Sequence, residues 1–102
     1  MASLTIETTP ADVGFDAERL ERIKSHFARY VGDGRLPGWL TVVARRGKVA
    51  FVAAGGRRDE AGAPVALDTI WRIYSMTKPI TSVAAMICYE QGAFGLLDPL
   101  EE

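Results

Sequence analysis

A serine and a lysine three residues apart are the side chains of this sequence best suited to chemistry. They are Ser75 and Lys78, in the tetrapeptide Ser-Met-Thr-Lys. A serine hydroxyl is a poor nucleophile until a base takes its proton, and residues three apart on a helix share one face. The spacing therefore favours a nucleophile beside its base, the pair that acyl transfer needs.

The residues around this pair indicate where it lies on a helix. Pro79 is tolerated only in the first helical turn, so Ser75 must lie at or just before the helix start. The helix N-terminus contributes about half a positive charge there, which favours a developing alkoxide. The backbone N–H of Ser75 could also form half of an oxyanion hole. The alternative is a serine that caps the helix and a solvated lysine in its first turn.

The rest of this helix argues for the chemical interpretation. It is predicted over residues 75–91, with Gly92 as the residue that ends it. From Ile80 to Tyr89 it is apolar nearly all round, and such a helix belongs inside a protein. A solvated lysine is unexpected at the head of a buried helix.

A first helix is predicted over residues 16–31. Asp16 is a good N-cap, and Phe15 and Leu20 occupy the positions of a hydrophobic staple. The apolar residues that follow recur at helical spacing, while charged residues fill the opposite face. This amphipathic helix must therefore lie on another apolar element.

A β-hairpin is predicted between the two helices, with strands over residues 39–45 and 48–54. The two-residue loop Arg46-Gly47 joins them, with glycine where a positive φ is wanted. Both faces of the hairpin are mostly apolar, so it requires a layer on each side. The first helix can cover only one of these faces.

The composition limits the function further. Of the 102 residues, 48% are hydrophobic and 25% charged, with a formal net charge of -1, which excludes a disordered chain and disfavours nucleic-acid binding. The chain has one cysteine, Cys88, which excludes an intrachain disulfide and a Cys-based zinc cage. It has one histidine, His26, which excludes a His-rich metal site. We expect no cofactor and no metal. No apolar run is long enough to span a membrane and no export signal opens the chain, so we expect a cytoplasmic location.

The segment WRIYSMTKPITSVAAM, residues 71–86, resembles the active-site segment of the β-lactamase-related serine hydrolases, whose signatures include Ser-x-x-Lys. That superfamily contains class C β-lactamases, D,D-peptidases and family VIII carboxylesterases. The likeness extends to residues 14–16, to the hairpin and to residues 92–99. It implies an α+β domain with three layers, α/β/α, and an antiparallel sheet. Residues 1–102 would be the N-terminal portion of that single domain, with the Ser75 helix between the sheet and a second, helical lobe.

The same resemblance implies that Ser75 is the acylated nucleophile and Lys78 its base. The motif sequence Ser-Met-Thr-Lys-Pro and the absent export signal favour a carboxylesterase acting on short-chain esters. One alternative is amide hydrolysis, as a β-lactamase or D,D-peptidase. Another is a non-catalytic fragment, because the family's tyrosine base and second oxyanion donor are not in these residues. The expected partners are a small ester or lactam and the remaining C-terminal part of the domain, with neither nucleic acid nor membrane.

Overall fold

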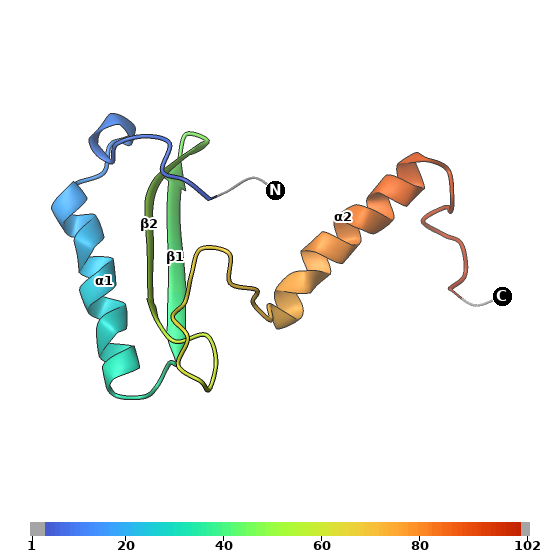
Figure 1. Ribbon diagram of the computed structural model, residues 1–102. Coiled ribbons are helices and arrows are strands. Elements are labelled where there is room, and N and C mark those ends of the chain that lie inside the picture. Colours follow the sequence, from blue (N-terminus) through green and yellow to red (C-terminus); the bar gives the residue numbers. More distant parts are fainter. Residues whose placement is uncertain (1–3, 101–102) are drawn as a thin grey trace. The chain divides into compact units, whose positions relative to one another are not determined.

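The chain forms an α+β structure with an antiparallel sheet, as the sequence predicted. The computed structural model describes residues 4–100, in two compact units, Met1–Ile70 and Trp71–Glu102. The elements in chain order (Figure 1) are η1 Ala11–Val13, α1 Ala17–Gly32, β1 Gly38–Arg45, β2 Lys48–Gly56, η2 Tyr74–Met76 and α2 Thr77–Glu90. No helix within residues 4–100 has the length and apolar character needed to cross a membrane.

Helix α1 begins where its capping residues predicted. Asp16 is the N-cap, and its side chain accepts a hydrogen bond from the backbone N–H of Arg19 at 3.0 Å. Such a cap satisfies an N–H group that has no partner within the helix. Of the predicted staple pair, Leu20 is buried in the core beneath the helix and Phe15 is half-buried against that core.

Strands β1 and β2 form the predicted hairpin, slightly longer than expected. Arg46 and Gly47 have φ values of 55° and 74°, the left-handed pair that a two-residue hairpin loop requires. The register runs from Gly38 opposite Gly56 to Arg45 opposite Lys48. It is interrupted by a bulge that leaves Ala50 without a partner on β1, a feature that the sequence pattern did not indicate.

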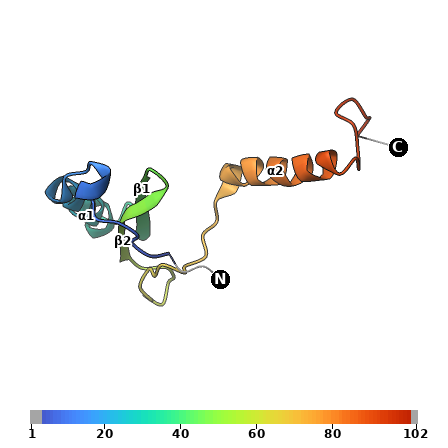
Figure 2. The same ribbon diagram turned by 90° about the horizontal axis from the view of Figure 1, so that it is seen from above.

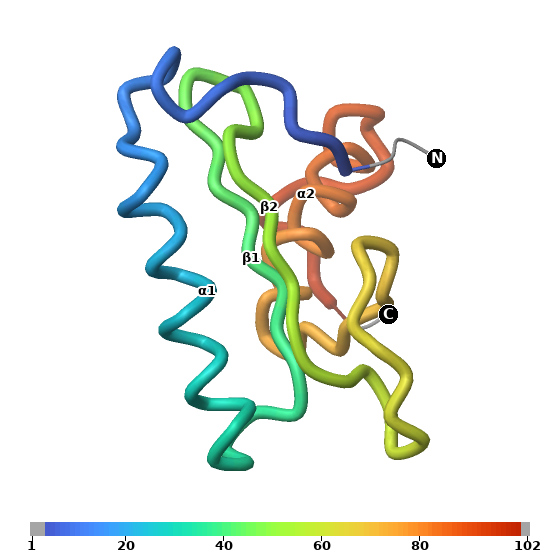
Figure 3. The backbone as a smooth tube through the Cα atoms, turned by 60° about the vertical axis from the view of Figure 1, so that its left-hand side comes forward, coloured from blue at the N-terminus to red at the C-terminus, as the bar shows by residue number. Residues whose placement is uncertain are grey.

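Helix α1 covers one face of the hairpin, as Figure 3 shows. The buried core residues are Leu20, Trp39, Phe51 and Ala53. The ring of Phe27 stacks on Trp39 with 5.2 Å between centroids. On the opposite face of the sheet, Val42 remains 41% exposed. The prediction that this helix covers only one of the two apolar faces is confirmed.

The second unit contains η2 and α2. Pro79 is the third residue of α2, within the first turn as required. The helix ends in a Schellman motif: Gly92, with φ of 74°, donates to the carbonyl of Tyr89 at 2.9 Å, and Ala93 donates to that of Cys88 at 3.0 Å. The predicted stop at Gly92 is therefore confirmed. The placement of this helix between the sheet and a second lobe stays a prediction.

Candidate functional site

Ser75 lies in the single turn that precedes α2. This turn, η2, is a 3-10 helix whose first hydrogen bond joins the N–H of Met76 to the carbonyl of Ile73 at 3.0 Å. The α-helix begins two residues later than predicted, at Thr77, because the chain enters it through this tighter turn. Ser75 thus lies just before the helix start, where the helix dipole favours negative charge.

Tyr74 has an unusual backbone conformation directly before the nucleophile candidate. Its φ is 45°, and with Arg46 it is one of two non-glycine residues with positive φ in the part of the chain the structure describes. A bulky residue in this region costs about 1–3 kcal/mol. Tyr74 is the first residue of η2, so this strain lies where the chain enters the turn that contains Ser75. Sequence reasoning missed this, because glycine is the residue that normally marks a positive φ.

Lys78 is the second residue of α2, one turn after Ser75. Both residues are exposed. Within residues 71–100, two hydrogen bonds involve a side chain. The Thr81 hydroxyl donates to the carbonyl of Thr77, and the N–H of Gly95 donates to the Asp98 carboxylate. The structure therefore brings Ser75 and Lys78 onto adjacent turns but does not join them by a hydrogen bond. Apo geometry of this kind does not exclude a catalytic pair, because such bonds often tighten only with substrate.

A shallow hollow of about 420 Å³ lies on α2 beside Lys78. Its lining residues recur at helical spacing and present a mainly apolar surface; they are Thr77, Lys78, Thr81, Ser82 and Ala85. Ser75 is not among them. The helix also leaves Ile80 and Val83 62% and 61% exposed.

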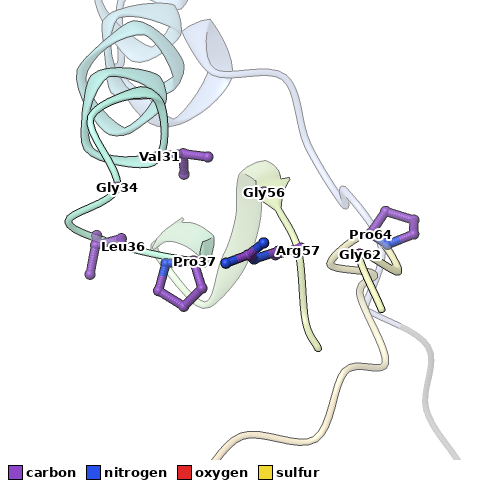
Figure 4. Close-up of a pocket in the computed structure, with 8 residues that line it drawn as sticks. All are labelled: Val31, Gly34, Leu36, Pro37, Gly56, Arg57, Gly62 and Pro64. Carbon is purple, nitrogen blue, oxygen red and sulfur yellow. The ribbon is translucent and has the colours of Figure 1, made fainter. Parts of the chain in front are cut away.

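A second hollow, of about 600 Å³, lies in the first unit at the end of β2. The Arg57 side chain extends into it (Figure 4), between residues from the end of α1 and from the loop after β2. The residues that line it are Val31, Gly34, Leu36, Pro37, Gly56, Arg57, Gly62 and Pro64. None of these can act as a nucleophile or as a base at neutral pH, so this hollow is no alternative to the Ser75 site.

Comparison with known proteins places these elements in a family. The family model described as Beta-lactamase matches residues 23–102, which include the hairpin, Ser75 and Lys78. The chain belongs to the beta-lactamase family. The resemblance seen in the sequence is thereby confirmed.

Two relatives show how much of this family the chain covers. An uncharacterized protein of Mycobacterium tuberculosis is 46% identical over 68 residues, which are 66% of this chain and 17% of that protein. The esterase EstB of Burkholderia gladioli is 34% identical over 93 residues, which are 89% of this chain and 24% of EstB. The chain therefore spans about a sixth to a quarter of the length of these relatives. The family match and the likeness to EstB support its membership in a serine hydrolase superfamily.

Proposed function

We propose that this chain is the nucleophile-bearing portion of a serine hydrolase that cleaves short-chain carboxylic esters. The observation that carries the proposal is the position of Ser75 in the turn before α2, with Lys78 one turn later. The name of EstB as an esterase supports the choice of esters. The description of the family as Beta-lactamase supports the alternative, amide hydrolysis by a β-lactamase or D,D-peptidase.

In the proposed reaction, the Ser75 Oγ attacks the ester carbonyl carbon while its proton passes to the Lys78 amine. The carbonyl oxygen becomes an oxyanion, which the backbone N–H of Ser75 stabilises together with the helix dipole. Collapse of this intermediate expels the alcohol with a proton and leaves an ester between Ser75 and the acyl group. Water then hydrolyses that ester, which releases the acid and restores the serine.

The proposal assigns the remaining groups to the rest of the family's fold. A second oxyanion donor and a tyrosine base are expected there, since this chain spans 17% and 24% of its relatives. The partner proposed for the chain is therefore the C-terminal part of such a domain. We also propose a cytoplasmic location. A truncated fragment without catalysis is the competing hypothesis.

A hybrid of EstB tests the nucleophile. In this EstB hybrid, the region matched by the chain is replaced by the chain itself, and the protein is treated with a fluorophosphonate. We expect the label on Ser75, none on a Ser75→Ala variant, and labelling slower by about 10²–10⁴-fold in Lys78→Ala. Ser82→Ala, which removes another α2 serine, is the matched control and should label normally. A label on a different serine would remove the assignment.

The choice between ester and lactam is tested on the same preparation. We expect kcat/KM for a p-nitrophenyl ester of a short acid to exceed that for nitrocefin. The opposite ranking would favour the β-lactamase alternative. If Ser75→Ala abolished the activity on both substrates, Ser75 would remain the nucleophile whichever substrate class is preferred.

A further inference from the structure

A slot of about 400 Å³ lies between α1 and the outer edge of β2. Its walls are mostly small side chains and backbone from these two elements, so space remains that larger residues would fill. The residues that line it are Lys24, Ala28, Val31, Gly32, Trp39, Ala54, Gly55 and Gly56. All of them belong to the first compact unit, so the slot does not depend on where α2 lies. Its volume is in the range of small-molecule pockets.

The chain itself occupies the outer edge of β2 on either side of the slot. The N–H of Glu7 donates to the carbonyl of Val49 at 2.8 Å, and the N–H of Val49 donates to the Glu7 carboxylate at 2.8 Å. Near the other end of β2, the N–H of Val65 donates to the carbonyl of Gly56 at 3.1 Å. Figure 2 shows the N-terminal segment and the chain after β2 on this side of the hairpin. A further strand therefore cannot run the length of this edge, and what stays open is the short slot.

Lys24 supplies a positive charge at one end of the slot. Its Nζ lies 5.6 Å from the centre of the Phe51 ring. It also forms an ion pair with Glu21 at 2.7 Å, and its side chain remains 50% exposed. An ammonium group has three N–H donors, so it can bind a second carboxylate beside that of Glu21. This end of the slot therefore favours a ligand with a negative charge.

Trp39 supplies an unused hydrogen-bond donor further along the slot. Its side chain is 8% exposed, and its indole N–H has no hydrogen-bond partner among the described residues. The edge of the indole lies against Gly55, where a side-chain carbon would come within 2.8 Å of the indole nitrogen. A buried donor without a partner is destabilising, and an acceptor oxygen would remove that cost. This end of the slot therefore favours a ligand with an oxygen acceptor.

We propose that the slot binds a small aromatic carboxylate with a second oxygen at the far end of its ring. Lys24 and Val31 are about 10 Å apart along the axis of α1, a length that such a molecule spans. Its carboxylate pairs with the Lys24 ammonium, and its flat ring lies between Ala28 and Gly55. A small rotation of the Trp39 ring brings the indole N–H to the far oxygen. This inference does not depend on the proposed hydrolase activity.

Isothermal titration of the whole chain with three matched compounds tests the ligand chemistry. Hydrocinnamate has the ring and the carboxylate, its para-hydroxy derivative adds the far oxygen, and the amide of that derivative lacks the charge. We expect the para-hydroxy acid to bind about tenfold more tightly than either of the others, because each of them lacks one polar contact. Equal affinities for the three compounds, or no binding of any, would overturn the proposal.

Two leucine variants of α1 locate the binding site. Ala28→Leu fills the slot and should abolish binding of the para-hydroxy acid. Ser25→Leu adds a leucine to α1 outside the slot, so it is the matched control and should bind normally. Both positions are exposed, so neither change should prevent folding, which far-UV circular dichroism checks. Unchanged binding in Ala28→Leu would overturn the proposal.

Variants of the two polar ends assign the contacts. Trp39→Phe removes the indole N–H and should abolish the preference for the para-hydroxy acid over hydrocinnamate, whatever it does to packing. Lys24→Met should weaken both acids by about tenfold and leave the amide unaffected. Glu21→Gln should tighten both acids, because it removes a competing carboxylate. A para-hydroxy preference that survives in Trp39→Phe would contradict the proposal.

The EstB hybrid shows whether the slot stays open when the rest of the family's fold is present. We expect the hybrid to bind the para-hydroxy acid as tightly as the chain does, and to lose this binding in Ala28→Leu. Binding by the chain that disappears in the hybrid would mean that the rest of the fold covers the slot, and would overturn the proposal.

Discussion

The ring of Phe27 on α1 stacks on the ring of Trp39 on β1, with 5.2 Å between centroids and 26° between planes. This contact joins the helix to the hairpin across a core that also contains Leu20 and Phe51. The indole N–H of Trp39 is buried without a hydrogen-bond partner among the described residues. The stacking surface of Trp39, rather than its polar atom, therefore holds the two elements together.

Two variants test this relationship. Phe27→Ala should lower the free energy of unfolding by about 2–3 kcal/mol, less than for a fully buried ring, because the half-buried side chain leaves a smaller cavity against Trp39. Trp39→Phe should change it by only about 1 kcal/mol, since removal of an unsatisfied N–H offsets part of the lost packing. Urea unfolding followed by far-UV circular dichroism measures both. A larger loss in Trp39→Phe than in Phe27→Ala would contradict this account, because the indole would then contribute more than its stack with Phe27.

The strain at Tyr74 gives a prediction about the nucleophile. In the EstB hybrid, Tyr74→Gly should keep the turn, because glycine adopts a φ of 45° without steric cost. It should nevertheless slow fluorophosphonate labelling of Ser75 by about tenfold, since the serine is less firmly placed. Tyr74→Phe is the control and should label at the normal rate. Normal labelling in Tyr74→Gly would show that the strained backbone at Tyr74 does not affect the reactivity of Ser75.

The ion pair after α1 gives a prediction about pH. Arg35 donates to the Asp33 carboxylate at 2.9 Å, and this hydrogen bond holds the pKa of Asp33 below its ordinary value. A lowered carboxyl pKa means that the pair stabilises the fold above the unfolded pKa and loses this effect as pH falls through the folded one. Arg35→Ala should therefore raise the pKa of Asp33, as measured by carboxyl carbon chemical shifts in an NMR titration. An unchanged pKa would mean that another group lowers it.

The apolar surface of α2 gives a prediction about the chain by itself. Ile80 and Val83 are 62% and 61% exposed, on a helix whose side chains are apolar nearly all round. Contiguous apolar surface beyond a few hundred Å² promotes association. We expect the 102-residue chain to bind a hydrophobic dye strongly, to oligomerise, and to show no turnover that depends on Ser75. A compact monomer with esterase activity lost in Ser75→Ala would contradict this.

The sequence by itself determined the elements that depend on neighbouring residues. Asp16 caps α1, Arg46 and Gly47 form the hairpin loop, and Gly92 ends α2, because each acts on backbone groups within a few residues. The position of Ser75 at a helix start follows in the same way from Pro79. The position of Ser75 in the candidate site could therefore be predicted from local rules.

Only the tertiary structure decided the features that join distant segments. It placed Phe27 on Trp39, inserted the bulge at Ala50, and paired Glu7 with Val49 at the edge of β2. It also gave Tyr74 a positive φ, which the sequence did not indicate because the residue is not a glycine. Backbone strain and strand-edge pairing are set by the sum of many contacts, and residue type at one position does not specify that sum.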